Sequence, residues 1–291
     1  MPDITKRPIK PPRTFAEQVQ LLRQRGLILD DQFFVEQILS EANYYRLSAY
    51  LLPFKDPITD CYRPNIHFKT IYNIYEFDRK FRGLILSAIE PIEILLRTTI
   101  AYYHAHNYGP EGYMLADNFE NRDYHTKFVV EFEQIIEKNQ KNLFVKHHIE
   151  NYGGKFPLWV AVEIFSFGML SKFYANMKTE DRKSIAKELN TGAEYLKSWL
   201  ISITDLRNRC AHYMRLYFHK LVVSPKLPKG IYREYSGRVF DIIYVMKYLY
   251  LSPEKWRNEF VRPLEALLDS YQEHLQVKYI GFPDNWLKLL N

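Results

Sequence analysis

The sequence predicts an all-α protein, and three observations support this. Apolar residues recur at spacings of three and four along most of the 291 residues. No stretch alternates apolar and polar residues as a series of strands would, and no tandem repeat or low-complexity tract interrupts the pattern. Hydrophobic residues make up 47% of the chain, which is enough to bury a substantial helical core.

Two short helices are expected first, over residues 15–22 and 33–39. Gly26 separates them, and Asp30 or Asp31 is placed to cap the start of the second. Residues 53–65 contain three prolines and are expected to form a loop. We therefore divide the chain into an amino-terminal basic arm with short helices, residues 1–65, and a helical domain, residues 66–291.

The helical domain is expected to begin with a long helix from Phe68 to Gly109. Pro91 should kink this helix or begin a new one, because proline lacks an amide hydrogen and its ring crowds the preceding turn. Residues 216–232 are expected to form a loop, either irregular throughout or with a short hairpin at residues 221–223. Further helices are expected over residues 128–136, 155–175, 182–189, 195–213, 239–251 and 261–275.

Charge and cysteine content narrow the class of protein. The net charge of +6 and the pI of about 9.0 favour a polyanionic partner without proving one. The two cysteines, Cys61 and Cys210, exclude a disulfide framework and a cysteine-rich zinc site, so we expect a reducing, cytoplasmic location.

The amino terminus lacks the apolar segment of a signal peptide, and glutamates interrupt the longest apolar stretches. No membrane contact is therefore expected.

No metal or cofactor is expected either. His104 and His106 lie two residues apart, and His147 and His148 are adjacent. Neither spacing combines with an identifiable third ligand. We expect these histidines on the surface.

The segment Arg207-Asn208-Arg209-Cys210-Ala211-His212 is the most informative feature of the chain. Arginine stays charged and can hold a phosphate with two N–H groups, while histidine titrates near neutral pH and can move a proton. Asn208 lies one helical turn before His212. The candidate catalytic residues are therefore Arg207, Asn208 and His212. Arginine and histidine also occur at this spacing by chance, so ordinary solvated charges remain the alternative.

The expected helix does not by itself bring the arginine and the histidine together. Arg207 lies about 140° around an ideal helix from His212. Either the arginine side chain curls round, or the helix breaks near Ala211, or a second copy of the helix supplies the missing half. The last arrangement predicts a two-fold homodimer.

A basic and aromatic segment surrounds the motif. Between Asp205 and Arg238, eight basic residues stand against two acidic ones and are interleaved with tyrosine and phenylalanine. Basic groups follow phosphates, and exposed aromatic rings stack on unpaired bases, although a solvated basic face is the alternative. The basic residues are Arg207, Arg209, Arg215, Lys220, Lys226, Lys229, Arg233 and Arg238. RNA contacts are expected at Arg209, Tyr213, Arg215 and Lys220, and in a second cluster at Tyr45 and Arg46.

Arg97 and Glu163 are expected to support the motif from nearby. Glu93 lies one turn before Arg97 and should pair with it. Glu163 lies in an apolar segment with Trp159, which we expect in the core, and a carboxylate buried there needs a partner. Arg97, the motif arginine or a backbone amide could be that partner.

Four blocks of the sequence resemble the AbiD/AbiF-type abortive-infection family of bacterial anti-phage proteins. They span residues 15–26 with 43–50, residues 89–97, residues 157–171, and residues 206–212 with Arg215 and Leu216. This family looks like part of the HEPN superfamily. The resemblance therefore implies a HEPN-like helical bundle with an amino-terminal helical extension.

The resemblance also implies metal-independent RNA cleavage at a dimer interface. Arg207 and His212 match the catalytic positions of the superfamily, and Asn208 matches the polar residue beside the arginine. In that chemistry the 2′-hydroxyl of the RNA attacks the neighbouring phosphorus. Two functions stay open: an RNA endonuclease toxin of an anti-phage system, and a non-cleaving protein that holds a structured small RNA.

Overall fold

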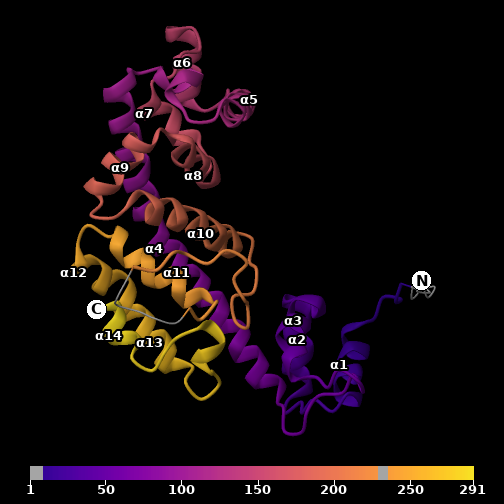
Figure 1. Cartoon of the computed structure of the whole chain (residues 1–291). Coiled ribbons are helices and arrows are strands. Elements are labelled where there is room, and N and C mark those ends of the chain that lie inside the picture. Colours follow the sequence, from indigo (N-terminus) through magenta and orange to yellow (C-terminus); the bar gives the residue numbers. More distant parts are fainter. Residues whose placement is uncertain (1–8, 229–234) are drawn as a thin grey trace, which may run out of the picture. The chain divides into compact units, whose positions relative to one another are not determined.

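The computed structural model describes residues 9–228 and 235–291 and is all-α, as the sequence predicts (Figure 1). In these residues β-structure is limited to isolated bridges, such as the one between Ile28 and His67. No helix in the described part of the chain is long and apolar enough to cross a membrane. The chain divides into two compact units. The first contains Met1–Arg79 and Ser270–Leu275, and the second contains Lys80–Asp269 and Gln276–Asn291.

The first unit contains α1 (Phe15–Gln24), α2 (Gln32–Glu41) and α3 (Tyr44–Leu51). Each helix begins at a polar cap. Thr14 forms a reciprocal capping box with Glu17, and the Asp31 side chain accepts a hydrogen bond of 3.1 Å from the Phe34 amide. Asp31 rather than Asp30 is therefore the cap of α2. Asn43 caps α3, a helix that the periodicity did not predict.

The long helix α4 (Phe68–Tyr108) contains Pro91 in its interior and continues through it. Of the two alternatives expected at Pro91, a kink or a new helix, the new helix is therefore wrong. An interior proline removes one hydrogen bond and costs about 3 kcal/mol. Ile89, Ile92 and Leu96 are all buried, so continuing the helix keeps an apolar face packed on both sides of the proline.

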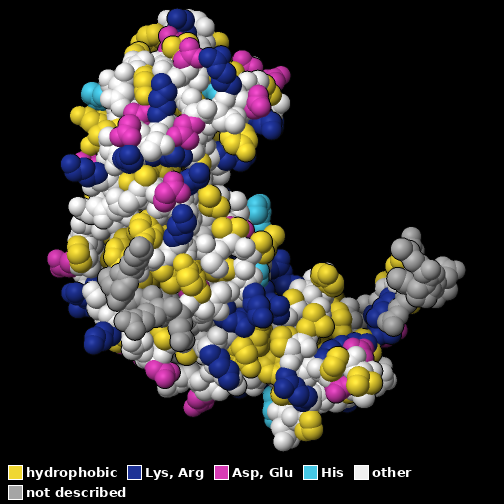
Figure 2. All heavy atoms as spheres, viewed as in Figure 1, with side chains coloured by type: hydrophobic (Ala, Val, Ile, Leu, Met, Phe, Trp, Pro, Cys, Tyr) yellow, Lys and Arg dark blue, Asp and Glu magenta, His cyan; other side chains and the backbone are white. Residues whose placement is uncertain are grey.

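The second unit is built from the part of α4 after Arg79 and the helices that follow it. They are α5 (Arg122–Lys138), α6 (Leu143–Tyr152), α7 (Leu158–Ala161), α8 (Phe167–Asn176), α9 (Thr179–Glu188), α10 (Ala193–Ala211), α11 (Val239–Met246), α12 (Pro253–Trp256), α13 (Arg262–Ser270) and α14 (Trp286–Leu290). A short 3-10 helix lies in the first unit at Leu52–Phe54. In the second unit, 3-10 helices lie at Gly112–Met114, Ala116–Asn118, Val162–Ile164, Lys247–Leu249 and Val277–Ile280, and a π-helix at Arg257–Val261. On the face shown in Figure 2, lysine and arginine are interspersed with aspartate and glutamate over the part formed by α5 to α9.

Helix α10 contacts α8, α9 and α11, and it buries the face that its periodicity predicts. The buried residues include Leu196, Trp199, Leu200, Ile203, Leu206 and Cys210. The indole Nε1 of Trp199 donates a hydrogen bond of 2.7 Å to the carbonyl oxygen of Lys226, which attaches the segment after α10 to the helix. Among the described residues, that segment forms no hairpin at residues 221–223. In the same part of the chain the Leu221 amide donates a hydrogen bond of 2.8 Å to the Gly237 carbonyl.

The apolar segment over residues 155–175 forms two helices instead of the single helix expected. The chain leaves the helical path at Phe165, and the Ser166 side chain caps α8 by accepting a hydrogen bond of 3.1 Å from the Met169 amide. A serine placed before an apolar run favours a helix start over a helix interior. The capping chemistry therefore overrides the continuous apolar pattern.

His104 is buried inside the second unit, contrary to the expectation of a surface histidine. Its side chain has no exposed surface and lies against the rings of Tyr108, Phe119 and Phe173, at centroid distances of 4.9 to 5.4 Å. Among the described residues, neither ring nitrogen has a hydrogen-bond partner. Burial lowers the pKa of His104 to about 4, because the apolar surroundings disfavour the charged imidazolium.

We expect the stability of the fold to depend on pH through His104. Its pKa is lower in the folded chain than in the unfolded chain, so unfolding takes up a proton whenever the pH lies between the two values. Stability is therefore complete above about pH 6.5. It should fall by about 1.4 kcal/mol for each unit of pH between 6.5 and 4. Urea unfolding of His104→Phe should show this dependence reduced by that amount, while His147→Phe, at an exposed position, should keep it. An equal pH dependence in His104→Phe and the unmodified protein would contradict the assignment.

Candidate functional site

The predicted motif lies at the carboxyl end of α10, where the helix terminates in a defined turn. The helix ends at Ala211, and His212 is its C-cap. The amide of Tyr213 bonds to the Cys210 carbonyl at 3.1 Å, and the amide of Met214 bonds to the Arg209 carbonyl at 2.8 Å. This is the Schellman pattern, in which the residue after the cap adopts a left-handed conformation and is commonly glycine. Tyr213 occupies that position with φ of 58°.

Asn208 and His212 lie one turn apart and are both exposed. The amide of His212 still donates to the Asn208 carbonyl, at 2.9 Å, so His212 keeps its place in the helical repeat. Of the three arrangements considered for the motif, the structure therefore contains the break after Ala211. Because the helix ends only after Ala211, His212 keeps its helical position and is not turned toward Arg207.

The side chain of Arg207 is partly buried against α4. Its Nε atom lies 3.9 Å from the Oε2 atom of Glu93, and 41% of the arginine side chain remains exposed, compared with 16% of the glutamate. A separation of 3.9 Å is an ion pair and too long for a hydrogen bond. Glu93 therefore attracts the guanidinium group without occupying its N–H groups.

The other oxygen of Glu93 belongs to Arg97. The Arg97 Nη2 atom donates to Oε1 of Glu93 at 2.5 Å, which confirms the pair expected from the spacing of four residues. Arg97 also donates to the carbonyl oxygens of Val162 and of Phe165, the latter at 2.7 Å. Arg97 thus holds the two carbonyl groups at the break between α7 and α8. A chain of alternating charges, Arg207–Glu93–Arg97, links α10, α4 and that break.

A cavity of about 310 Å³ opens beside this chain of charges. Its polar lining consists of Arg207, Arg97, Glu93 and Glu90, and its apolar lining of Leu86, Ile89 and Ile94. The cavity therefore presents two arginines and two glutamates. A second hollow of about 550 Å³ shares Arg97 and is bordered by Trp159 and Glu163 among others.

Glu163 and Trp159 differ from the sequence expectation, because both are exposed. The carboxylate of Glu163 is solvated and needs no partner, and Arg97 pairs with Glu93 instead. The sequence missed the role of Glu93 as the partner of Arg207. The available signal was the spacing of Glu93 and Arg97, but that spacing shows only one of the two contacts that the carboxylate makes.

The basic residues around the motif fall into two groups. Some are held within the fold. Arg209 pairs with Asp205 at 2.7 Å, Lys226 lies 3.6 Å from Glu194, and Arg238 donates to the carbonyls of His219 and Tyr279. Lys220 is exposed, as is the aromatic Tyr213, of which 67% is exposed. Arg215 is half-buried, and its guanidinium lies 5.7 Å from the centre of the Phe218 ring. Lys229 and Arg233 lie outside the described residues.

Tyr45 and Arg46 lie in the first turn of α3 and are both exposed. They belong to the first unit, while the motif belongs to the second. Within residues 9–228 and 235–291, no group of three or more histidine, cysteine, aspartate or glutamate side chains is arranged to hold a metal ion.

Comparison with known proteins identifies one family. A family model described as "Abi-like protein" matches residues 37–218, a range that runs from α2 through α10 and includes the whole motif. No curated protein and no solved structure matches the chain.

We expect Arg97 to be a major contributor to stability. Arg97→Ala removes the side-chain donor of the Phe165 carbonyl, leaves the Val162 carbonyl with the Phe165 amide alone, and leaves Glu93 with a single, more distant partner. Losses of this kind cost about 3 kcal/mol when the groups are largely buried. Urea denaturation followed by circular dichroism measures the change. Arg122→Ala is the matched control, because it breaks an exposed pair with Asp117 and should cost less than about 1 kcal/mol. Equal losses in the two variants would disprove the role assigned to Arg97.

Proposed function

The chain belongs to the Abi-like protein family, and on that premise we propose that it is an RNA endonuclease of a bacterial abortive-infection defence against phage. Arg207, Asn208 and His212 form its catalytic site. The observation that carries the proposal is the arrangement at the end of α10. An arginine lines a cavity there and is held by a carboxylate, while an asparagine and a histidine stand exposed on the same helix end.

These groups have the chemistry that RNA cleavage requires. RNA supplies its own nucleophile, the 2′-hydroxyl, so the protein needs only to move protons and to stabilise charge on the phosphate. The 2′-hydroxyl gives up its proton as its oxygen bonds to phosphorus, the bond from phosphorus to the 5′-oxygen breaks, and the departing oxygen takes up a proton. His212 is the proton donor or acceptor, and Arg207 stabilises the charge on the scissile phosphate. Asn208 orients the imidazole or holds a phosphate oxygen.

The angular separation of the pair leads us to propose a homodimer. Arg207 and His212 lie about 140° apart around α10, and the break after Ala211 leaves that angle unchanged, because the His212 amide still bonds to the Asn208 carbonyl. A two-fold arrangement sets Arg207 of one copy beside His212 of the other. Tyr213, Arg215 and Lys220 then border the site and contact the RNA strand, with Arg209 supporting them from its pair with Asp205.

A non-cleaving RNA-binding protein is the second candidate function. Within one chain the histidine does not converge on the arginine, and binding of a structured small RNA requires no convergence. Basic and aromatic side chains after α10 are suited to phosphates and unpaired bases in either case. Tyr45 and Arg46 provide a further contact surface on the first unit.

We expect His212→Ala and Arg207→Ala to abolish RNA cleavage while leaving the fold intact. Loss of a general acid or base typically lowers the rate about 10²-fold to 10⁴-fold, and loss of a group that stabilises the phosphate charge about 10²-fold to 10³-fold. The assay uses labelled structured RNA, with chemical identification of a 2′,3′-cyclic phosphate end. His147→Ala and Arg122→Ala are matched controls at exposed positions outside the motif.

Three results would count against cleavage by this site. Full activity in His212→Ala removes the histidine from the mechanism. An equal loss in His147→Ala shows that the loss is not specific to the motif. Tight, salt-sensitive binding of RNA by the unmodified protein without any product favours the second candidate function instead.

A mixing experiment tests the shared site. Arg207→Ala and His212→Ala are inactive alone, but a mixed dimer contains one intact pair, with Arg207 from one chain and His212 from the other. Half of the dimers in an equal mixture are mixed, so about a quarter of the activity of the unmodified protein should return. Mass measurement confirms that mixed dimers form, which requires tags of different size on the two chains. Mixed dimers without activity would place the whole site within one chain.

A further inference from the structure

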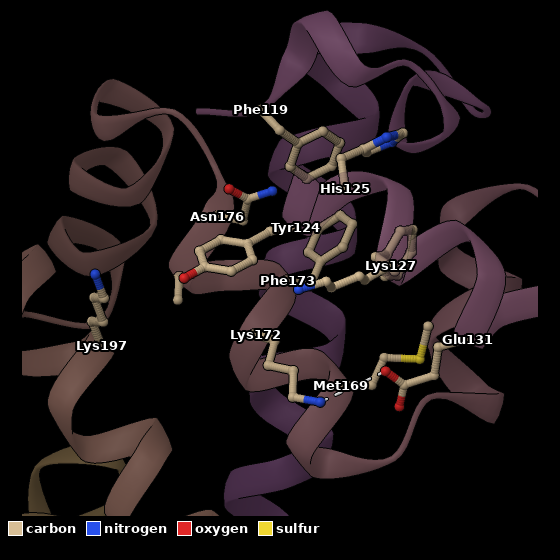
Figure 3. A pocket seen from close by; sticks show the side chains of 12 residues that line it. Phe119, Tyr124, His125, Lys127, Glu131, Met169, Lys172, Phe173, Asn176 and Lys197 are labelled. Atoms are coloured by element: carbon tan, nitrogen blue, oxygen red, sulfur yellow. Dashed lines mark ion pairs between the residues drawn. The ribbon is translucent and has the colours of Figure 1, made fainter. Parts of the chain in front are cut away.

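The second unit contains another cavity, of about 470 Å³, whose lining includes no residue of the motif. It lies among α5, α8 and α10, and its walls are mainly aromatic: Phe119, Tyr124, Phe128 and Phe173, with Met169 at one side (Figure 3). Its volume lies in the usual range for small-molecule sites, about 300 to 1,000 Å³. Lys197 on α10 also lines this cavity and stands ten residues before Arg207, which is about 15 Å along the helix axis.

Two polar side chains in the wall of this cavity, Asn176 and His125, are already engaged within the protein. The amide of Asn176 exchanges two hydrogen bonds of 3.0 Å with the backbone of Asn121. The Nε2 atom of His125 lies 3.0 Å from the carbonyl oxygen of Tyr113. The wall is therefore suited to an apolar group held by contact with rings. A flat aromatic ring gains stacking interactions here in addition to burial, and an aliphatic chain gains only burial.

Charged side chains lie around the same cavity. Lys127, Lys172 and Lys197 come from three different helices, α5, α8 and α10 (Figure 3). Glu131 is the one acidic residue in the lining, and it lies 3.7 Å from Lys172 in an exposed pair. Exposed pairs of this kind are weak and open readily to a competing anion. Three lysines and one glutamate leave a surplus of two positive charges, which matches the charge of a phosphate monoester near neutral pH.

We propose that this cavity binds a nucleotide, with the base among the aromatic side chains and the phosphate at the lysines. The combination of ring-lined walls and a surplus of two positive charges favours a flat ring that carries a phosphate. The same chemistry is offered by a free mononucleotide and by the 5′-phosphorylated end of an RNA. The site is separate from the Arg207 cavity and does not depend on cleavage there.

Calorimetric titration of the full chain tests the proposal. The probes are the four ribonucleoside 5′-monophosphates, adenosine, octanoate, and a short RNA with and without its 5′-phosphate. We expect saturable binding of at least one monophosphate. Adenosine should bind at least about tenfold more weakly because it lacks the phosphate, and octanoate at least about tenfold more weakly because it lacks the ring.

Two variants locate the binding, and two others act as controls. Lys127→Glu combined with Lys197→Glu reverses charge at the rim and should weaken binding at least about tenfold without touching the core. Ala175→Trp, also in the lining, should block the cavity. Lys187→Glu, an exposed lysine outside the lining, should leave nucleotide binding unchanged. Arg207→Ala should also leave it unchanged, so this result is independent of the cleavage assay.

The RNA probes separate the two sources of the nucleotide. A 5′-phosphorylated RNA that displaces the bound monophosphate, or that binds where no monophosphate does, indicates an RNA end. Its binding must then depend on the 5′-phosphate and on Lys127 and Lys197. Octanoate binding as tightly as the monophosphates would overturn the proposal. So would the absence of any binding that depends on both the phosphate and these lysines.

Discussion

The carboxylate of Glu93 connects the parts of the second unit that form the candidate site. It is largely buried, and a buried carboxylate is tolerated only when it is paired. One oxygen pairs with Arg97 and the other faces Arg207, so a single side chain links α10 to α4. Arg97 in turn holds the carbonyls of Val162 and Phe165, where the chain must leave the helical path between α7 and α8. The same three charges therefore support the fold and position the motif arginine.

Local signals in the sequence predicted the parts of this arrangement that depend on local chemistry. The apolar spacing on α10 predicted its buried face, and the spacing of Glu93 and Arg97 predicted their ion pair. Interactions between distant segments could not be predicted in this way. The contact of Glu93 with Arg207 depends on how α4 and α10 pack, and the aromatic cavity is assembled from three helices. At Pro91 the sequence left a kink or a new helix open. A proline costs a helix about 3 kcal/mol locally, and α4 nevertheless continues through it with Ile89, Ile92 and Leu96 buried on both sides.

The turn after α10 determines how the motif meets solvent. Tyr213 adopts a left-handed conformation, which costs a residue with a side chain about 1 to 2 kcal/mol relative to glycine. Tyr213 is held in this conformation by the two Schellman hydrogen bonds and by the burial of Leu216 and Tyr217 just beyond the turn. The consequence is that α10 ends at Ala211, with His212 as its C-cap. Asn208 and His212 stand on an open helix end, and the Tyr213 ring lies beside them in solvent.

The charges that line the Arg207 cavity bear on whether a single chain could hold a phosphate there or whether the proposed dimer is required. Two arginines and two glutamates line the cavity, so one chain presents no net positive charge to a phosphate. Glu93 also competes with any phosphate for the guanidinium of Arg207, because opposite charges about 4 Å apart attract appreciably even near a protein surface. A partner that brings its own exposed basic residues, among them Lys220, and its own His212 would correct both deficits at once. It would raise the local positive potential and would supply the proton-transferring group on the side of the phosphate that Arg207 does not reach. If the proposed cleavage takes place in a two-fold dimer, an isolated chain would be inactive, because it holds Arg207 in an internal ion pair and lacks a partner's His212.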